Sequence, residues 1–182
     1  DILGSDPKAY LGLVTAPKEA NASSLRRVVN VIIDYFRSMI ENNDLRDLLW
    51  YGSKPRTERA AQLLFFAIGN VLCASNDVDI SPETNSGGGP VDFKFSKGYA
   101  GRQLVEIKLS TGRVVSGYEK QLERYKKAVK GSEGIFLIIN VGGMGKKLST
   151  IRRLQSQALA RGETVCDIIV VDARKTPSAS KR

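Results

Sequence analysis

Residues 87–110 read GGGPVDFKFSKGYAGRQLVEIKLS. Within them the runs VDFKFS and QLVEIKLS both alternate apolar and polar residues, which predicts two β-strands. A turn formed by residues 97–101 would join the strands into an antiparallel hairpin and would place Asp92 opposite Glu106. The Cβ atoms of opposed residues lie roughly 4.5–5.5 Å apart, where two like charges destabilise a sheet. We therefore expect a cation beside this pair.

Lys108 or a metal ion could supply that positive charge. Lys108 shares a strand face with Glu106, because side chains two residues apart point the same way. A site made of Asp92, Glu106 and the Ile107 backbone carbonyl offers only oxygen and suits Mg²⁺, with Mn²⁺ as a substitute. Lys108 would then orient a water or stabilise charge on a phosphate. An E-x-K triplet also occurs on the solvated face of ordinary strands, so this interpretation needs further support.

The segments before the hairpin have helical patterns. The spacing of apolar residues over 23–43 predicts an amphipathic helix, and residues 44–56 predict a short helix and a loop. Residues 57–74 predict a second helix with Thr57 as its N-cap. Its middle is apolar almost all round, so we expect it to be deeply buried. Residues 78–89 predict a short extended piece and a loop rich in turn-forming residues.

The segments after the hairpin alternate helices with strands. Residues 116–131 predict a helix that opens on a capping box of Ser116 and Glu119. The apolar run 134–141 is typical of a central strand. A helix over 147–162 and a last buried strand over 165–173 follow. The segment VGGMGKK between strand and helix does not match the spacing of a phosphate-binding P-loop, so it indicates a tight turn.

The predicted order is therefore helix, helix, strands, helix, strand, helix, strand. The two late strands alternate with helices, which indicates right-handed crossovers and a parallel part of the sheet, whereas the hairpin is antiparallel. The pattern predicts an α/β fold in which helices flank a mixed sheet. We expect a single domain with an N-terminal helical segment over 1–56, a core over 57–174 and a disordered basic tail over 175–182.

The charge and apolar content of the chain indicate which classes of binding partner suit it. It has 182 residues and a formal net charge of +9, which suits nucleic acid first and an anionic membrane surface second. No run approaches the ~18 apolar residues of a membrane span, and no signal-peptide pattern is present, so we expect a cytoplasmic protein without a membrane partner. Cys73 and Cys166 lie in apolar runs, which favours buried free thiols.

The sequence contains no histidine. Its absence excludes Ser-His-Asp and Cys-His catalysis as well as nucleases that use a histidine base. Two cysteines without histidine also cannot form a structural zinc site of the usual kind. Any catalysis must therefore depend on carboxylates, lysine, tyrosine, serine or a hard metal ion.

The segments GGPVD and EIK, in this order, resemble the motif of the PD-(D/E)XK nuclease superfamily. The motif is written here as Pro90-x-Asp92 and Glu106-x-Lys108. The resemblance covers about residues 57–141 and implies a restriction-endonuclease-like fold. It also implies that Asp92 and Glu106 bind a divalent metal, while Lys108 assists hydrolysis of a phosphodiester.

The following segment QLERY resembles the Gln-x-x-x-Tyr element of the RecB-like branch. This likeness implies that Gln121 and Tyr125 line the site near the scissile phosphate. The superfamily often adds a glutamate from the helix before the hairpin, which implies Glu58 as a further metal ligand, with Gln62 on the same helix face. Simpler roles stay open, because Glu58 suits any helix N-terminus and Gln121 and Tyr125 suit a helix surface.

Basic and aromatic side chains near these motifs offer contacts to nucleic acid. Four of the basic residues cluster about the hairpin in the sequence and could hold a phosphate backbone: Lys94, Lys97, Arg102 and Arg113. They could equally be solvated charges. Trp50 and Tyr51 could stack on a base, or they could lie in the core or at an edge.

These patterns together predict a Mg²⁺-dependent nuclease that acts on nucleic acid, with DNA ahead of RNA. Two other functions stay open: a binding module of the same fold without hydrolysis, and an RNA nuclease such as a toxin that targets transfer RNA. A homodimer also stays open, because nucleases that cut both strands with one site per chain often dimerise.

Overall fold

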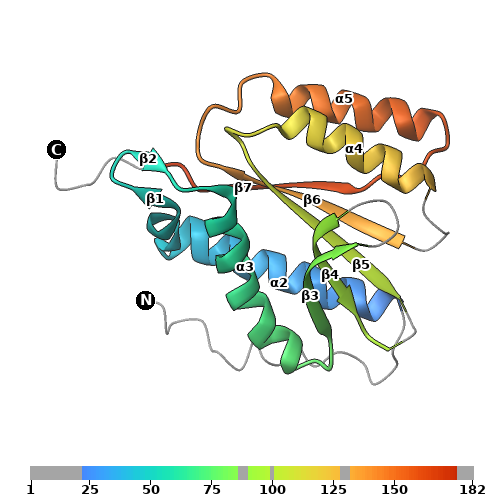
Figure 1. Cartoon of the computed structure of the whole chain (residues 1–182), viewed down its shortest axis with the longest axis horizontal. Helices are drawn as coiled ribbons and strands as arrows, with labels where there is room; N and C mark the ends of the chain where they lie inside the picture. Colours follow the sequence, from blue (N-terminus) through green and yellow to red (C-terminus); the bar gives the residue numbers. More distant parts are fainter. Residues whose placement is uncertain (1–21, 86–89, 99–100, 128–131, 176–182) are drawn as a thin grey trace.

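The predicted hairpin lies inside a five-stranded mixed sheet in the computed structural model of the chain (Figure 1). The structure describes residues 22–85, 90–98, 101–127 and 132–175. The strands follow the spatial order β3-β4-β5-β6-β7, antiparallel from β3 to β5 and parallel from β5 to β7. They are β3 (Asp79–Asn85), β4 (Pro90–Ser96), β5 (Arg102–Leu109), β6 (Ser132–Asn140) and β7 (Asp167–Asp172). The mixed sheet, antiparallel hairpin and parallel strands are confirmed.

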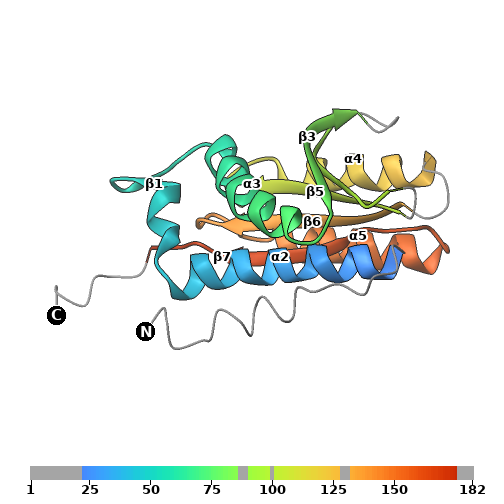
Figure 2. The same ribbon diagram turned by 90° about the horizontal axis from the view of Figure 1, so that it is seen from below.

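Within the described residues four helices flank this sheet, so the expected α/β class is confirmed. They are α2 (Ala22–Asn42), α3 (Glu58–Ala74), α4 (Val114–Lys127) and α5 (Lys147–Ala160). Figure 2 shows α2 lying lengthwise along the sheet. Between α2 and α3 the chain forms the 3₁₀-helix η1 (Leu45–Leu49) and a small antiparallel sheet of β1 (Trp50–Tyr51) and β2 (Lys54–Pro55).

Two apolar clusters attach the helices to opposite faces of the sheet. On one face, α2 and α3 pack against the sheet, and the Phe65 ring centroid lies 5.3 Å from those of Phe36 and Phe93. On the other face, α4 and α5 enclose a second cluster, in which Tyr118 and Phe136 also lie 5.3 Å apart. Because α2 shares its cluster with the sheet, the described part of the N-terminal helical segment packs directly on the core.

The hairpin register agrees with the prediction as far as the two strands pair. Ser96 pairs with Arg102, and the ladder continues as far as Phe93 and Val105. Beyond that point β4 still pairs with β3 as far as Pro90, but it no longer pairs with β5. Asp92 and Glu106 therefore lie one step past the end of the ladder, where the two strands separate.

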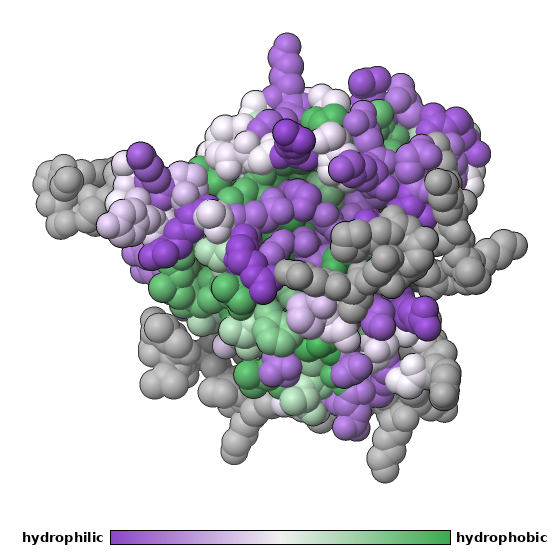
Figure 3. Space-filling view, viewed as in Figure 1, coloured by the Kyte–Doolittle hydropathy of each residue, from purple (hydrophilic) through white to green (hydrophobic). Residues whose placement is uncertain are grey.

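The prediction that α3 is deeply buried was wrong. The exposed fraction is 53% for Leu63 and 66% for Val71, and Figure 3 shows apolar surface over this helix. The buried residues form one stripe at four-residue spacing: Ala61, Phe65, Gly69 and Cys73. Among the described residues the helix has neighbours on one side only, and apolar composition does not reveal on how many sides a helix is covered.

Two further details differ from the prediction. Helix α4 begins at Val114, because the Gly117 N–H already donates to the Arg113 carbonyl at 2.9 Å, so Ser116 lies inside the helix and is not its cap. Strand β7 is at the edge of the sheet, and only Val171 of its six residues is buried, because β6 covers one edge of the strand alone.

Other expectations are confirmed or lie outside the described residues. Cys73 and Cys166 are buried and unbridged, as predicted. Gly162 ends α5 with a φ of +71°, as a helix-terminating glycine does. Across the described ranges, no helix combines the length and apolar character needed to cross a membrane. The lead-in 1–21, the glycine loop 87–89, Gly131 and the tail 176–182 lie outside the described residues.

Candidate active site

The candidate site lies where β4 leaves β5. We call this opening the fork and define it by Ile107–Leu109 of β5 and the side chains that contact them. The N–H groups of Ile107 and Leu109 are two residues apart and point to the edge that β4 no longer covers. The Ile107 N–H donates to Asp92 Oδ2 at 2.6 Å, and the Leu109 N–H donates to Glu58 Oε2 at 3.2 Å. Carboxylates thus replace the carbonyls of a neighbouring strand.

The first turn of α3 supplies one side of the fork. The helix begins at Glu58 and Thr57 occupies the N-cap position in an extended conformation, as predicted, but its side chain makes no capping hydrogen bond. One turn later, Gln62 Nε2 donates to Asp92 Oδ1 at 2.9 Å, so both oxygens of Asp92 accept hydrogen bonds. Helix α3 therefore places Glu58 itself in the fork and holds Asp92 in position through Gln62.

Lys108 lies at the centre of the fork. Its Nζ atom is 2.8 Å from Glu58 Oε1 and 3.0 Å from Glu106 Oε1, and it donates to the Ile107 carbonyl at 3.1 Å. The aliphatic part of the side chain runs close to Gly117 of α4, where a Cβ atom would lie 3.4 Å from Lys108 Cε. The glycine therefore leaves the space that the Lys108 side chain occupies.

Helix α4 completes the fork on the side of Glu106. Glu106 Oε2 is buried and has no hydrogen-bond partner within the described structure. Arg124 Nη1 lies 3.8 Å from Glu106 Oε2 and donates to Gln121 Oε1 at 2.9 Å. Gln121 is almost fully buried and thus helps to hold Arg124 beside the site.

The environment raises the pKa of two groups, which favours the neutral form of Asp92 and the charged form of Lys108. Burial raises the pKa of the Asp92 carboxyl from 3.8 to about 6, and the negative charge of Glu106 adds to this rise. Burial would lower the pKa of Lys108, but Glu106 and Glu58 outweigh it and hold that pKa above the ordinary 10.5. Lys108 is therefore an ammonium ion at neutral pH and cannot accept a proton from water.

In the part of the chain that the structure describes, the carboxylates of the fork outnumber the cations in the ion pairs around them. Glu58 and Glu106 pair with Lys108 and, at a longer distance, Glu106 with Arg124, whereas the printed contacts of Asp92 are with the neutral Gln62 amide and the Ile107 N–H. Half-buried negative charge without full compensation is costly, which is why the pKa of Asp92 rises. A further positive charge at the fork would relieve this imbalance.

Only part of the predicted ligand set has oxygen atoms available for a metal ion. Glu58 contacts Lys108 with one oxygen and the Leu109 N–H with the other, so it positions Lys108 in this arrangement. Over the described ranges, no three acidic or cysteine side chains are close enough together to hold a metal ion. Asp92 likewise accepts hydrogen bonds at both oxygens, from Gln62 and the Ile107 N–H, and the Ile107 carbonyl accepts one from Lys108. Among the described residues Glu106 Oε2 is the one fork carboxylate oxygen without a hydrogen bond, so a divalent ion bound there would share the oxygens of Asp92 and Ile107 with these donors and complete its shell with water.

The structure brings together most of the site residues predicted from the sequence. Those that contact the fork, directly or through Arg124, are Asp92, Glu106, Lys108, Glu58, the Ile107 carbonyl and Gln121. Tyr125 belongs to α4, but its side chain lies outside the described residues. Arg124 was not predicted, although it lies three residues after Gln121 and such residues are neighbours on a helix face. No sequence signal pointed to Gly117.

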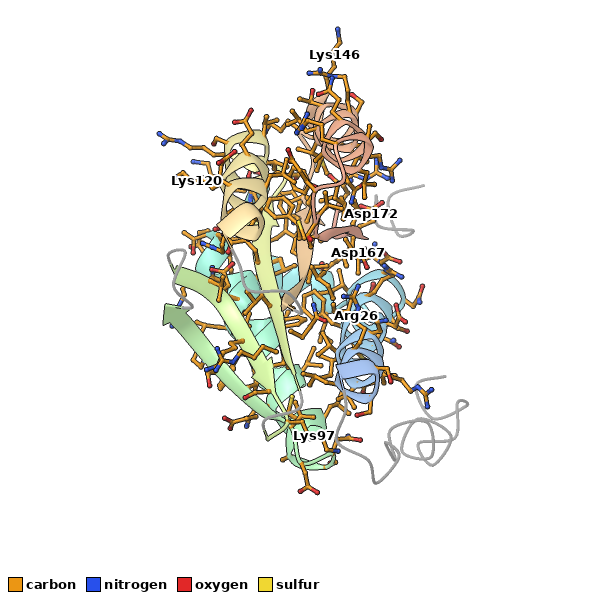
Figure 4. The ribbon with its side chains drawn as sticks, turned by 90° about the vertical axis from the view of Figure 1, so that its right-hand side faces the viewer. Arg26, Lys97, Lys120, Lys146, Asp167 and Asp172 are labelled. Carbon is orange, nitrogen blue, oxygen red and sulfur yellow. The ribbon has the colours of Figure 1, made fainter. Side chains whose placement is uncertain are left out.

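The four basic residues predicted to contact nucleic acid do not form one cluster. Lys94 shares the strand face of Asp92, and Arg113 is exposed beyond the end of β5 that carries the fork. Arg102 begins β5 at the opposite end, and Lys97 Nζ donates to the Asn76 carbonyl at 3.0 Å near the end of α3. Figure 4 shows Lys97 far from Lys146, which lies at the fork end of the sheet.

The loop that follows the fork is tied to the turn before α5. Ser110 Oγ donates to the Gly142 carbonyl at 2.5 Å and accepts the Val141 N–H at 3.0 Å. Lys147 Nζ donates to the Ser110 carbonyl at 2.6 Å. The segment VGGMGKK is thus a tight strand-to-helix turn, as predicted, and it holds the end of β5 in place.

Comparison with known proteins identifies a family for this chain. The family DUF8371, described as a domain of unknown function, matches residues 25–143. No curated protein and no solved structure matches the chain. The matched range extends from α2 to just past β6, so it contains every residue of the fork.

Proposed function

This chain belongs to the DUF8371 family, and we propose that it is a divalent-metal-dependent nuclease that hydrolyses phosphodiester bonds, with DNA ahead of RNA as substrate. The convergence of Asp92, Glu106 and Lys108 at the fork carries the proposal. The two strands and the helix that supply the site are those expected from the resemblance to PD-(D/E)XK nucleases. Gln62 and Glu58, from a helix 30 to 50 residues away along the chain, contact Asp92 and Lys108 respectively, and Lys108 in turn contacts Glu106.

The finer description of the fold belongs to the same proposal. A helix, three antiparallel strands, a helix and a parallel strand follow one another from α3 to β6. This is the order expected of a restriction-endonuclease-like core. Helix α2 would then be an N-terminal addition, and α5 with β7 would extend the parallel half of the sheet.

Asp92, Glu106 and the Ile107 carbonyl would hold Mg²⁺ or Mn²⁺. The ion would stabilise negative charge on a phosphoryl oxygen and lower the pKa of a bound water. Glu106 Oε2 is the oxygen best prepared for this role, because it is buried and accepts no hydrogen bond from the described residues. Gln62 and the Ile107 N–H hold the Asp92 carboxylate in one orientation.

Lys108 would act as a fixed positive charge. Its raised pKa keeps the side chain protonated, so it would donate hydrogen bonds to the attacking water or to the phosphate and would not be the base. Glu58 would position Lys108 through the 2.8 Å ion pair. Arg124, held by Gln121, would lie on the opposite side of Glu106, within reach of the same phosphate.

The direct test is cleavage of plasmid and single-stranded DNA with Mg²⁺ or Mn²⁺. We expect Asp92→Asn, Glu106→Gln and Lys108→Met to reduce the rate by about 100-fold or more, as loss of one transition-state contact usually does. Glu119→Gln is the matched control, because Glu119 is an exposed acid on α4. Cleavage that survives all three substitutions at the fork would contradict the mechanism.

One observation favours a second function, a nucleic-acid-binding module without hydrolysis. Glu58 and Asp92 already accept hydrogen bonds at all four carboxylate oxygens, which leaves Glu106 as the one fork carboxylate with an available oxygen. DNA binding without cleavage, together with no heat of Mg²⁺ or Mn²⁺ binding by calorimetry, would support this alternative. Preferential competition by transfer RNA over DNA would identify RNA as the substrate.

A further inference from the structure

The β1–β2 hairpin directly precedes the helix that enters the fork. Trp50 pairs with Pro55 and Tyr51 pairs with Lys54, and Gly52 turns the chain with a φ of +58°. Two residues separate the hairpin from Glu58. Figure 1 shows the hairpin projecting beside the start of α3. None of its side chains has a part in the proposed mechanism.

Several contacts hold the hairpin against the rest of the protein. The Arg56 N–H donates to the Leu49 carbonyl at 2.8 Å, and Arg56 Nε donates to the Trp50 carbonyl at 3.2 Å. Trp50 Nε1 donates to the Ala173 carbonyl at 2.9 Å, and Lys175 Nζ lies 5.6 Å from the centroid of the Trp50 ring. The hairpin is thus attached both to the start of α3 and to the segment after β7.

The outer surface of this anchored hairpin presents an aromatic ring among cations. Tyr51 is 76% exposed, and the Arg56 guanidinium carbon lies over its ring, 5.9 Å from the centroid. Lys54, Arg56 and Lys175 are exposed as well. An exposed aromatic face beside positive charge is the combination that binds single-stranded nucleic acid, because the ring stacks on a base while the cations contact phosphates.

We propose that the β1–β2 hairpin is a stacking platform for single-stranded nucleic acid, on which an unpaired base packs against Tyr51 while the strand continues to the fork. The inference rests on the proposed function, which supplies nucleic acid as the substrate. It deepens that function by specifying that the nucleic acid is single-stranded where it contacts the β1–β2 hairpin. Bases inside a duplex are covered on both faces by their neighbours, so away from the duplex ends only an unpaired base can offer a face to Tyr51. The surrounding cations favour a polyanion over an apolar protein surface.

Trp50 provides a local signal for the test, because it is the one tryptophan of the chain and adjoins Tyr51. Single-stranded and duplex oligonucleotides of equal length are titrated in EDTA, while Trp50 fluorescence and anisotropy of the labelled DNA are recorded. We expect Tyr51→Ala to weaken single-strand binding about tenfold, as the loss of one stacked base does, and to leave duplex binding unchanged. Tyr51→Phe should bind like the wild type.

Two further variants separate stacking from other effects. Leu48→Ala is the matched control, because Leu48 is an exposed apolar residue of the neighbouring η1, at 58%, and should have no effect. Lys54→Ala should weaken binding and reduce the salt dependence by about one phosphate contact. Thermal melting of each variant checks that the fold is retained. We expect it to be retained, because the Leu48 and Lys54 side chains are exposed.

Equal single-strand affinity of Tyr51→Ala and the wild type would overturn the inference and would leave the hairpin as a surface for a protein partner. An equal loss for duplex and single strand would overturn it as well. Cleavage of DNA by the wild type decides the nuclease proposal separately. Single-strand binding that depends on Tyr51, without any cleavage, would support the stacking platform and contradict the nuclease proposal. Cleavage with single-strand binding that does not depend on Tyr51 would support the nuclease proposal and contradict the platform.

Discussion

Replacement of Asp92 by Asn tests whether the fork is the charged, partly dehydrated site described above. The substitution removes the ionisable group but keeps an oxygen that can accept the Ile107 N–H. Gln62 can rotate its amide to match the new side chain. The change therefore removes the charge with little disturbance of the hydrogen bonds.

The expected magnitude follows from the pKa of Asp92, which is about 6 in the folded chain and 3.8 ordinarily. Because the folded-state pKa is raised, the folded chain binds the proton more tightly than the unfolded chain does. Stability is thus greatest below about pH 4 and is lost as the pH rises through 6. Each pKa unit corresponds to about 1.4 kcal/mol, so the shift gives about 3 kcal/mol, which solvent at the half-buried side chain reduces to about 2 kcal/mol.

The assay is urea unfolding of the wild type and Asp92→Asn between pH 4 and pH 8 in EDTA. We expect the free energy of unfolding of Asp92→Asn, relative to the wild type, to rise by about 2 kcal/mol across this range. Asp34→Asn is the matched control, because Asp34 is an exposed acid on α2 and should give a constant difference. Mg²⁺ at pH 8 should stabilise the wild type and have little effect on Asp92→Asn.

Parallel pH curves for the wild type and Asp92→Asn would refute the reasoning about charge and burial at the fork. Equal stabilisation of both proteins by Mg²⁺ would show that the ion binds elsewhere. The two results are independent of each other and of any nuclease activity.

Three further outcomes are expected. Lys108→Met should reduce the free energy of unfolding at pH 8 by about 3 kcal/mol, because it leaves Glu58 and Glu106 largely buried without the cation that they contact. Urea unfolding that shows no loss of stability would contradict these ion pairs. Phe65→Ala should cost about 3–5 kcal/mol in the same assay, since its fully buried ring contacts three other rings, and Leu63→Ala on the exposed side of α3 should cost far less. Mg²⁺ affinity by calorimetry should fall about tenfold per pH unit below pH 6, because Asp92 must be ionised to bind the ion, and a flat profile from pH 5 to pH 7 would exclude Asp92 as a ligand.

Local patterns in the sequence were sufficient to predict the elements and much of the site. The two-residue alternation of VDFKFS and QLVEIKLS predicted β4 and β5, and the length of the turn between them predicted the pairing of Ser96 with Arg102. The side-chain period of a strand then put Asp92 on the face of Lys94, and Glu106 on the face of Lys108. These properties depend only on nearby residues, so one sequence can reveal them.

Properties that depend on neighbours distant in sequence could not be predicted in the same way. Periodicity assigned a helix to 57–74 but could not show that Leu63 and Val71 face outward, because burial depends on which elements pack beside α3. The basic residues Lys97 and Arg102 are near Asp92 along the chain, yet the length of β5 separates them from Lys108. Arg124 reaches Glu106 only because α4 crosses over the sheet.

The sequence by itself determined the α/β order of elements, the hairpin, the alternating faces of its strands and the residue types available for chemistry. The tertiary structure alone decided that β4 pairs with β5 only from Phe93 to Ser96 and that the first turn of α3 occupies the opening beside Asp92. The physical reason is that the exposed N–H groups of Ile107 and Leu109 must find acceptors once the ladder ends. Asp92 and Glu58 become those acceptors, which places Glu58 with Glu106 against Lys108 and Asp92 beside the neighbouring Ile107 N–H at one end of the sheet.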